Sequence, residues 1–259
     1  MDRIILRREK MDIPSQYGIA SVKRIGQPVR MLQLRWFSSI RKGKSVSSAR
    51  WLARQQNDHV VKQAKREGLR SRAAFKLREL NAKYDLIRKG NVVIDLGAAP
   101  GGWTQIAIDE CRKGNVNPPS DARVQVVAVD LLPFDAFPGV GVVVGDFRLP
   151  DVREKISVLL DGRKADVVLS DMAPSFSGLG FRDSEEQLRL CQNALRMAQL
   201  YLKPGGRFVS KILRSPAGDQ FRQEMKPFFT DVKTFKPESS RTESVEIFAV
   251  GLGFRTPPP

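Results

Sequence analysis

Four short valine-rich segments, separated by longer amphipathic ones, constrain the fold of this chain more than any other feature. They read NVVIDL at 91–96, VQVVAVD at 124–130, GVVVGD at 141–146 and ADVVLSD at 165–171. Nearly continuous apolar strands are typical of parallel sheets that helices cover on both faces. The intervening segments have helical spacing, so the alternation predicts an α/β fold of the Rossmann-like type.

The second half of the chain extends this pattern. A fifth strand is predicted at PGGRFVSKIL, residues 204–213, and two more at 231–237 and 244–252. The short connection between the last two predicts an antiparallel hairpin at one edge of a mostly parallel, seven-stranded sheet with helices on both faces. The helices are expected at 58–82, interrupted near Gly68, and at 102–113, 151–160, 183–203 and 217–228.

Each of the four valine-rich segments ends in or near an aspartate. These residues are Asp95, Asp130, Asp146 and Asp171. In an open α/β sheet, ligands bind beyond the carboxyl ends of the strands. Crowded carboxylates repel one another unless a ligand with hydrogen-bond donors lies between them, so the set indicates a binding site. The alternative is that single aspartates cap the helices that follow them.

The first strand leads into a turn, GAAPGGW at 97–103, that has neither the spacing of a dinucleotide site nor the lysine of a phosphate-binding loop. Its glycines, Gly97, Gly101 and Gly102, allow a ligand to approach the backbone, and Trp103 is expected to form an apolar wall beside that ligand.

The aspartates after the second and third strands suit a nucleoside. We expect Asp130 to accept the two ribose hydroxyls and Asp146 to accept an adenine amino group. A nucleoside that lacks phosphate and carries a charged amino-acid tail is S-adenosylmethionine. The turn and the ordered strand-end acids together therefore predict an S-adenosylmethionine site.

The net charge of +16 is unevenly distributed. Residues 1–56 contain 13 Lys and Arg against 3 Asp and Glu, residues 57–90 contain 10 against 4, and residues 91–259 contain 21 of each. The whole excess therefore precedes or leads into the glycine-rich turn. Such a concentration of positive charge is typical of a surface that binds RNA phosphates.

Part of this charge has a second interpretation. No acidic residue occurs between Ile13 and Asn57, and residues 31–50 combine Arg, Lys, Ser and bulky apolar residues. This composition is typical of a mitochondrial presequence, so we expect residues 1–56 to direct the protein to the matrix, with Met31 a possible true start. The competing hypothesis is a basic arm that stays on the protein and binds RNA.

Several other functional classes are disfavoured by composition. Cys111 and Cys191 lie far apart and form no paired metal-binding motif, so we expect two reduced thiols, no disulfide and no metal site. The single histidine, His59, lies outside every motif. No apolar run is long enough for a membrane span, and we expect a monomer of one main domain with a disordered tail at 255–259.

Seven segments, in order across residues 57–253, resemble the FtsJ (RrmJ) family of ribosomal RNA 2′-O-ribose methyltransferases. They read SRAAFKL, DLGAAPGGW, VDLLPF, GDFR, LSDMAPSFSG, LKPGGRFVSKIL and SRTESVEIFAVG. The lead-in from Trp51 to Leu77 most resembles the mitochondrial members. The resemblance implies an S-adenosylmethionine-dependent methyltransferase domain at 57–254, acting on a uridine of large-subunit ribosomal RNA in an assembling mitoribosomal subunit.

The resemblance also implies site residues. The family's catalytic Lys-Asp-Lys-Glu set matches Lys76, Asp171, Lys211 and Glu246, with Glu243 the less suitable alternative for the glutamate. Its cofactor contacts match Gly101, Trp103, Asp130, Asp146 and Asp171.

A ribose hydroxyl is a poor nucleophile until its proton is removed, so the reaction needs a base. We expect Lys211 to be the proton acceptor, with a pKa lowered by partial desolvation and by the neighbouring Lys76. Asp171 is expected to bridge cofactor and hydroxyl, and Lys76 and Glu246 to support it. Methylation of a base amine is disfavoured because DMAPSF, residues 171–176, lacks the usual Pro-Pro-aromatic sequence, and a covalent carbon mechanism lacks a suitably placed cysteine.

A basic helix at the start of the domain is the expected RNA-binding element. Its candidate contacts are Lys62, Lys65, Arg66, Arg70 and Arg72. Contacts of this kind to phosphates give affinity and register without reading the sequence. Two alternatives remain open from sequence: a ribosome-assembly factor in which catalysis is secondary or lost, and a 2′-O-methyltransferase of transfer RNA or of a messenger cap.

Overall fold

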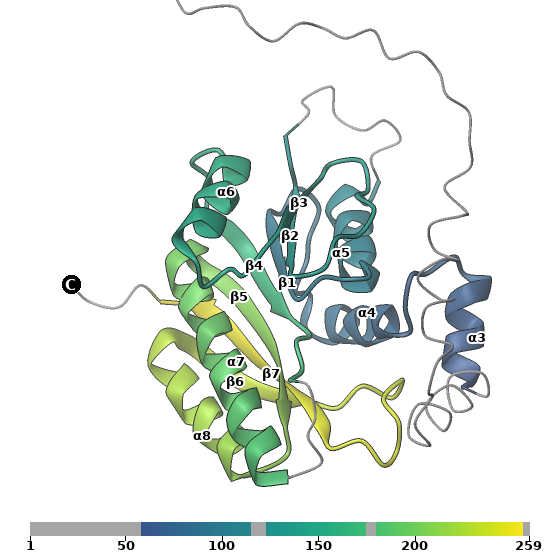
Figure 1. Cartoon of the computed structure of the whole chain (residues 1–259), viewed down its shortest axis with the longest axis vertical. Coiled ribbons are helices and arrows are strands. Elements are labelled where there is room, and N and C mark those ends of the chain that lie inside the picture. The colour runs from purple at the N-terminus through teal and green to yellow at the C-terminus, as the bar shows by residue number, and fades with distance from the viewer. Residues whose placement is uncertain (1–57, 115–122, 175–179, 256–259) are drawn as a thin grey trace, which may run out of the picture. The chain divides into compact units, whose positions relative to one another are not determined.

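The computed structural model describes residues 58–114, 123–174 and 180–255, and Figure 1 shows its helices and strands. The expected presequence at 1–56 therefore lies outside the described residues. The strands are β1 (Val93–Leu96), β2 (Val126–Asp130), β3 (Val140–Val144), β4 (Ala165–Ser170), β5 (Leu202–Leu213), β6 (Phe229–Phe235) and β7 (Glu246–Phe254). The helices are α3 (His59–Arg66), α4 (Ala73–Tyr84), α5 (Gly102–Arg112), α6 (Pro150–Leu160), α7 (Gly180–Tyr201) and α8 (Pro216–Met225), followed by a 3₁₀ turn (Lys226–Phe228).

The seven strands form one sheet in the order β3-β2-β1-β4-β5-β7-β6. Strands β1 to β5 run parallel to one another, whereas β7 runs antiparallel to both β5 and β6. This confirms the predicted mostly parallel sheet with an antiparallel hairpin at one edge. The strand order reverses between β1 and β4, which makes the carboxyl edge of these strands the expected ligand position.

Helices cover both faces of the sheet (Figure 1). Side chains alternate along each strand, so Val93 packs in one apolar cluster with Leu77 of α4 and Ile106 of α5. The next residue, Ile94, packs in the opposite cluster with α6, α7 and α8. Both clusters consist of buried apolar side chains, and they fix the strands whose ends carry the polar residues.

The helix predicted at 58–82 is divided in two where Gly68 adopts a left-handed φ of 68°. The side chain of Asp58 caps the first of these helices, α3, by accepting a hydrogen bond from the backbone of Val60 at 3.0 Å. At the other end of the chain, the backbone of Arg255 donates to Phe228 at 2.8 Å. Arg255 is therefore an ordered residue, which corrects its assignment to the tail; residues 256–259 lie outside the described part.

Among the described residues, no helix combines the length and apolar character that a membrane crossing requires.

Candidate active site

Four charged side chains from distant segments meet where β4, β5 and β7 approach α4. Lys211 lies on β5 and Glu246 begins β7, and the antiparallel register pairs Lys211 with Phe248 and Leu213 with Glu246. Lys211 and Glu246 are therefore diagonal neighbours on one face of the sheet. Asp171 follows directly after β4, and Lys76 reaches the same place from α4.

The four groups form a line of alternating charges. Nζ of Lys211 lies 3.2 Å from Oδ1 of Asp171 and 3.5 Å from Oε1 of Glu246, and it donates to the backbone oxygen of Asp171 at 2.6 Å. Nζ of Lys76 lies 3.3 Å from Oε2 of the same glutamate. Both lysines are buried. The structure thus brings together the whole set that the resemblance implied.

The pKa of Lys211 differs from the sequence prediction. Burial disfavours its ammonium form, but Asp171 and Glu246 outweigh that effect and hold the pKa of Lys211 above its ordinary value of 10.5. The predicted lowering of the pKa is therefore wrong for the protein without ligands. The sequence prediction placed Asp171 and Glu246 beside the lysines, but it gave desolvation and Lys76 more weight than the two carboxylates.

Glu246 shows the complementary effect. Burial raises its pKa, yet Lys211 and Lys76 prevail, and the pKa of Glu246 lies below its ordinary 4.5. The carboxylate therefore stabilises the fold above about pH 4.5, and this contribution is lost as the pH falls through the lowered pKa. Lys211 stabilises below about pH 10.5, and its contribution is lost as the pH rises through the raised pKa.

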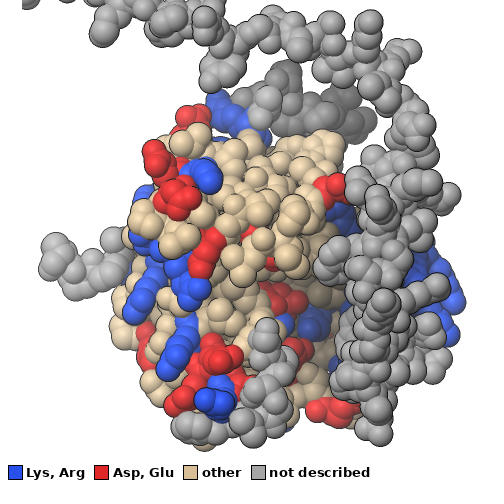
Figure 2. All heavy atoms as spheres, viewed as in Figure 1, with Lys and Arg blue, Asp and Glu red and all other residues tan. Residues whose placement is uncertain are grey.

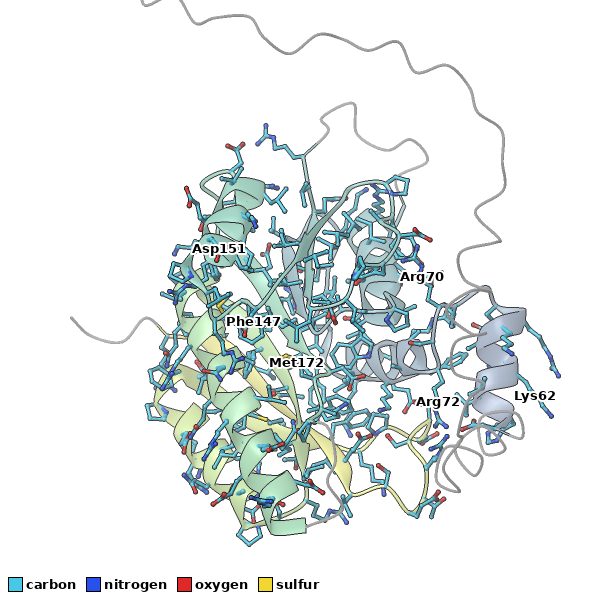
Figure 3. The ribbon with its side chains drawn as sticks, viewed as in Figure 1. Lys62, Arg70, Arg72, Phe147, Asp151 and Met172 are labelled. Atoms are coloured by element: carbon cyan, nitrogen blue, oxygen red, sulfur yellow. The ribbon has the colours of Figure 1, made fainter. Side chains whose placement is uncertain are left out.

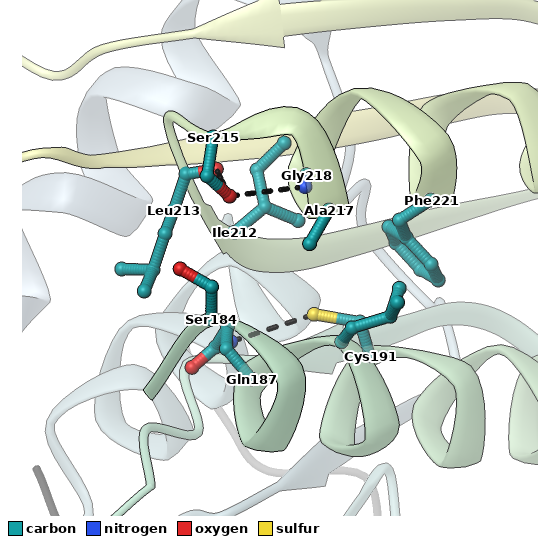
Figure 4. A pocket seen from close by; sticks show the side chains of 10 residues that line it. Ser184, Gln187, Cys191, Ile212, Leu213, Ser215, Ala217, Gly218 and Phe221 are labelled. Atoms are coloured by element: carbon teal, nitrogen blue, oxygen red, sulfur yellow. Dashed lines mark hydrogen bonds between the residues drawn. The ribbon is translucent and has the colours of Figure 1, made fainter. Parts of the chain in front are cut away.

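Three further side chains hold this line in place, and sequence reasoning assigned none of them this role. The backbone of Glu246 donates to Oγ of Ser244 at 3.2 Å, which fixes the start of β7. On the other face of β5, Gln187 of α7 donates to the backbone oxygen of Lys211 at 2.7 Å, and the thiol of Cys191 donates to the same oxygen at 3.1 Å. Figure 4 shows Gln187 and Cys191 in the small pocket between α7 and α8.

The glycine-rich turn, residues 97–102, lies at the carboxyl end of β1. A Cβ at Gly97 would approach the side chain of Met172 to 2.3 Å, and one at Gly102 would approach Ser71 to 2.0 Å. Glycine is therefore needed in this turn partly because Met172 and Ser71 pack directly against its backbone. Gly101 has a left-handed φ of 101° and is the N-cap residue of α5, so its position also requires glycine.

Trp103 is buried in the core and does not form a wall beside a ligand. Its indole Nε1 donates to the backbone oxygen of Ala73 at 2.8 Å, and its ring packs 5.4 Å from that of Phe248. The ring is 3% exposed. This corrects the sequence prediction, because the first turn of α5 directs the side chain toward α4 and β7. Trp103 supports the strand that carries Glu246.

The two aspartates expected to hold the nucleoside lie at the edge of the sheet. Asp130 ends β2, and its carboxylate accepts backbone hydrogen bonds from Ala99 at 2.9 Å and from Leu132 at 2.8 Å. It is therefore oriented between the glycine-rich turn and the segment that follows β2. Asp146 follows β3 and is ion-paired with Arg148, which holds the pKa of Asp146 below its ordinary value through direct hydrogen bonds.

Asp95, in β1, is 1% exposed. Its Oδ2 accepts a hydrogen bond from Thr104 at 2.7 Å, but Oδ1 has no hydrogen-bond partner among the described residues. Burial, together with the nearby Asp171 and Asp130, raises the pKa of Asp95 to about 7 despite the lowering effect of the hydrogen bond from Thr104. An unpaired buried oxygen beside the turn fits a ligand that carries an ammonium group, as S-adenosylmethionine does.

The raised pKa of Asp95 should make the stability of the fold depend on pH. An unfolded aspartate ionises near its ordinary 3.8, whereas the folded one keeps its proton to about 7. Stability therefore falls as the pH rises between these values and is constant above them. The side chain of Asp95→Asn cannot ionise. We therefore expect the melting temperature of this variant, minus that of the wild type, to increase as the pH rises from 4 to 7 and to stay constant above pH 7. A difference that did not change with pH would contradict the buried charge.

Residues 69–254 match the family model described as FtsJ-like methyltransferase. This chain belongs to the FtsJ-like methyltransferase family. Ribosomal RNA large subunit methyltransferase E of Granulibacter bethesdensis is 47% identical to it over 212 residues, which cover 82% of this chain and 87% of that protein. The protein of the same name from Acinetobacter baumannii is 44% identical over 209 residues, covering 81% and 93%.

A solved structure agrees with this assignment. The crystal structure of a protein from Plasmodium falciparum, named as a ribosomal RNA methyltransferase, superposes with a TM-score of 0.62 at 27% identity, covering 71% of this chain and 98% of that one. The family, the methyltransferase class and the S-adenosylmethionine-dependent type predicted from the sequence are confirmed.

The basic residues assigned to RNA binding divide into two groups in this FtsJ-like methyltransferase. Lys62, Lys65 and Arg66 are exposed on α3, and Figure 3 shows Lys62 pointing outward. Lys and Arg side chains gather at this edge of the molecule (Figure 2). These three residues remain available to a phosphate backbone.

Arg72 is not available in the same way. Its guanidinium is ion-paired with Asp58 and donates to the backbone oxygen of Ser239, and its side chain is 16% exposed. Arg241, close before β7, reaches the same carboxylate at 3.1 Å. The structure therefore corrects the prediction for Arg72, which joins α3 to the loop that precedes Glu246. Arg70 is half-buried, and its guanidinium donates to the backbone oxygen of Pro100.

Among residues 58–114, 123–174 and 180–255, no group of three or more His, Cys, Asp or Glu is placed to hold a metal ion. The thiols of Cys111 and Cys191 are buried, and burial raises the pKa of Cys111 to about 12. Both cysteines are therefore packing residues rather than nucleophiles.

Proposed function

We propose that this protein transfers a methyl group from S-adenosylmethionine to a ribose 2′-hydroxyl of ribosomal RNA. The observation that carries the proposal is the buried line of Asp171, Lys211, Glu246 and Lys76 at the carboxyl edge of the sheet. A thiol nucleophile is not part of this line, which suits oxygen as the acceptor rather than a base carbon. Bound S-adenosylmethionine supplies an electrophilic methyl group on a sulfonium.

The residues of the line have separate tasks in this proposal. Lys211 first loses its own proton to solvent. Its neutral amine would then accept the proton of the 2′-hydroxyl as the ribose oxygen takes the methyl group from the sulfonium, with S-adenosylhomocysteine as the leaving group. Asp171 lies against Lys211 and beside β1, so it orients the acceptor toward the donor site. Glu246 and Lys76 fix the position of the Lys211 ammonium from the other side. Such orientation matters because displacement at a methyl group tolerates little misplacement of the attacking oxygen.

We propose further that the substrate is a uridine of mitochondrial large-subunit ribosomal RNA in an assembling subunit, modified by a monomer in the matrix. Support comes from the names of the bacterial relatives, which act on large-subunit ribosomal RNA, and from the acid-poor, Arg- and Ser-rich composition of residues 13–57.

A map of ribose methylation at single-nucleotide resolution tests this function. Total and mitochondrial RNA would be compared between cells with the wild-type gene and cells in which it is disrupted. We expect disruption to remove one mark from mitochondrial large-subunit ribosomal RNA. Persistence of every mark would contradict the function, and loss of a mark from cytosolic RNA alone would contradict the location.

The exposed residues of α3 make a second prediction. Replacing Lys62, Lys65 and Arg66 with glutamine should weaken RNA binding and reduce the slope of log affinity against log salt by about 2 to 3, because each phosphate contact releases counterions. The matched control replaces Lys113, Lys155 and Lys226, which are exposed elsewhere. Equal losses in the two triple variants would show that α3 has no special role.

A further inference from the structure

Arg70 lies in the connection between α3 and α4, directly over the glycine-rich turn. A Cβ at Gly101 would come within 2.8 Å of its Nη1 and 3.1 Å of its Cδ. The same Nη1 donates to the backbone oxygen of Pro100 at 3.4 Å. The guanidinium is therefore in contact with the turn that begins α5, and Figure 3 shows it beside that helix.

The same guanidinium also contacts the segment 131–139, which follows Asp130. It donates to the backbone oxygen of Asp135 and stacks on the ring of Phe137, with its carbon Cζ 3.7 Å from the ring centroid. Phe134 lies 5.8 Å away on the same measure. Planar stacking on an aromatic ring combined with two backbone acceptors is an arrangement that arginine forms and lysine does not.

The backbone on either side of Arg70 is held as well. The amide of Gln105, in α5, accepts from the backbone of Arg70 at 3.2 Å and donates to the backbone oxygen of Gly68 at 3.1 Å. Arg70 is thus fixed at its backbone and its side chain, and the segment that carries it cannot move without the turn. An arginine that served only to bind an RNA phosphate would not need these hydrogen bonds and ring contacts within the protein.

We propose that Arg70 is a positioning residue of the cofactor site, which holds the glycine-rich turn and the segment 131–139 at a fixed spacing. This inference rests on the proposed function. Asp130 lies between the two segments and accepts a hydrogen bond from each of them, from Ala99 and from Leu132. The position of its carboxylate, the expected partner of the ribose hydroxyls, therefore depends on both segments and on the residue that joins them.

The test measures cofactor and RNA binding separately, with the full-length chain. Calorimetric titration with S-adenosylhomocysteine in the absence of RNA gives the affinity for the cofactor product. Filter binding of ribosomal RNA fragments gives the affinity for RNA. We expect Arg70→Ala to weaken S-adenosylhomocysteine about tenfold, as loss of charged hydrogen bonds typically does, and to leave RNA affinity within twofold. Arg70→Lys should fall between, because it keeps the charge but not the stack.

Steady-state kinetics provide a readout that a general loss of stability would not move. The KM for S-adenosylmethionine should rise about tenfold in Arg70→Ala, while kcat at saturating donor stays within about threefold. Arg78→Ala is the matched control, since Arg78 also lies over an aromatic ring, Phe75, but does not reach the turn. It should bind S-adenosylhomocysteine as the wild type does.

Other outcomes overturn the inference. Weaker RNA binding with unchanged S-adenosylhomocysteine binding would make Arg70 an RNA contact, and no change in either would make it an ordinary surface residue. If Arg70→Ala does not fold, Phe137→Leu decides, because it removes the stack alone and should weaken the same ligand. Wild-type protein that did not bind S-adenosylhomocysteine would instead contradict the proposed function.

Discussion

Replacing Lys211 with alanine is expected to slow methyl transfer by about 10²- to 10⁴-fold, the range that a positioned proton acceptor contributes. Lys211 is the one group of the line that touches both Asp171 and Glu246, so its loss removes the base and releases both carboxylates. Single-turnover rates, measured with saturating donor and RNA, would report the loss without a contribution from product release.

The variant needs a test of folding, because removal of one partner from a buried ion pair typically costs about 3–5 kcal/mol. Melting temperature and S-adenosylhomocysteine binding at low temperature provide it. Lys203→Ala is the matched control: Lys203 lies near the start of the same strand and is ion-paired with Asp166, away from the carboxyl edge. The control should keep full activity, and a folded Lys211→Ala variant with wild-type rates would exclude Lys211 as the base.

The rate of methyl transfer by the wild type is expected to rise about tenfold for each pH unit between pH 7 and 9, as a single required deprotonation predicts. The pKa of Lys211 lies above its ordinary value because two carboxylates outweigh burial, so the neutral, proton-accepting form is rare at pH 7. Each unit of pH below the pKa multiplies that form by ten. A rate that did not change over this range would contradict proton acceptance by Lys211.

A variant separates Lys211 from other groups that titrate. Glu246→Gln removes one of the two carboxylates that stabilise the ammonium, so the pKa of Lys211 should fall and the rising part of the profile should move to lower pH. The maximum rate should also fall, because Lys76 and Lys211 lose the group that lies between them. An unshifted profile would assign the titration to another residue.

The fold was predictable because its signals are local. Valine-rich strands such as 126–130 are apolar on both faces. Gly68 separates two helical segments through its own left-handed backbone conformation, which needs no contact with distant residues. The positions of the catalytic set followed from the resemblance, and the structure places those residues within a few ångströms of each other.

The corrected predictions concern contacts between residues far apart in sequence. Trp103 bonds to Ala73, and Arg72 reaches Ser239. From sequence, a tryptophan after a glycine-rich turn is expected to contact a ligand, and an arginine in a basic segment is expected to contact RNA. Neither pattern shows which residue of another helix or loop will pack against that side chain instead. The prediction for the pKa of Lys211 was wrong for a different reason, since burial and Lys76 were given more weight than Asp171 and Glu246.

The product of the reaction shows whether this FtsJ-like methyltransferase methylates a ribose oxygen. Purified protein would be incubated with S-adenosylmethionine labelled in its methyl group and with ribosomal RNA from cells that lack the protein, and the RNA would be digested to nucleosides. We expect label in a single 2′-O-methylated nucleoside, and none when Lys211 is replaced with alanine. Label on a base, or no transfer to any RNA by the folded wild type, would contradict methylation of a ribose oxygen by this protein.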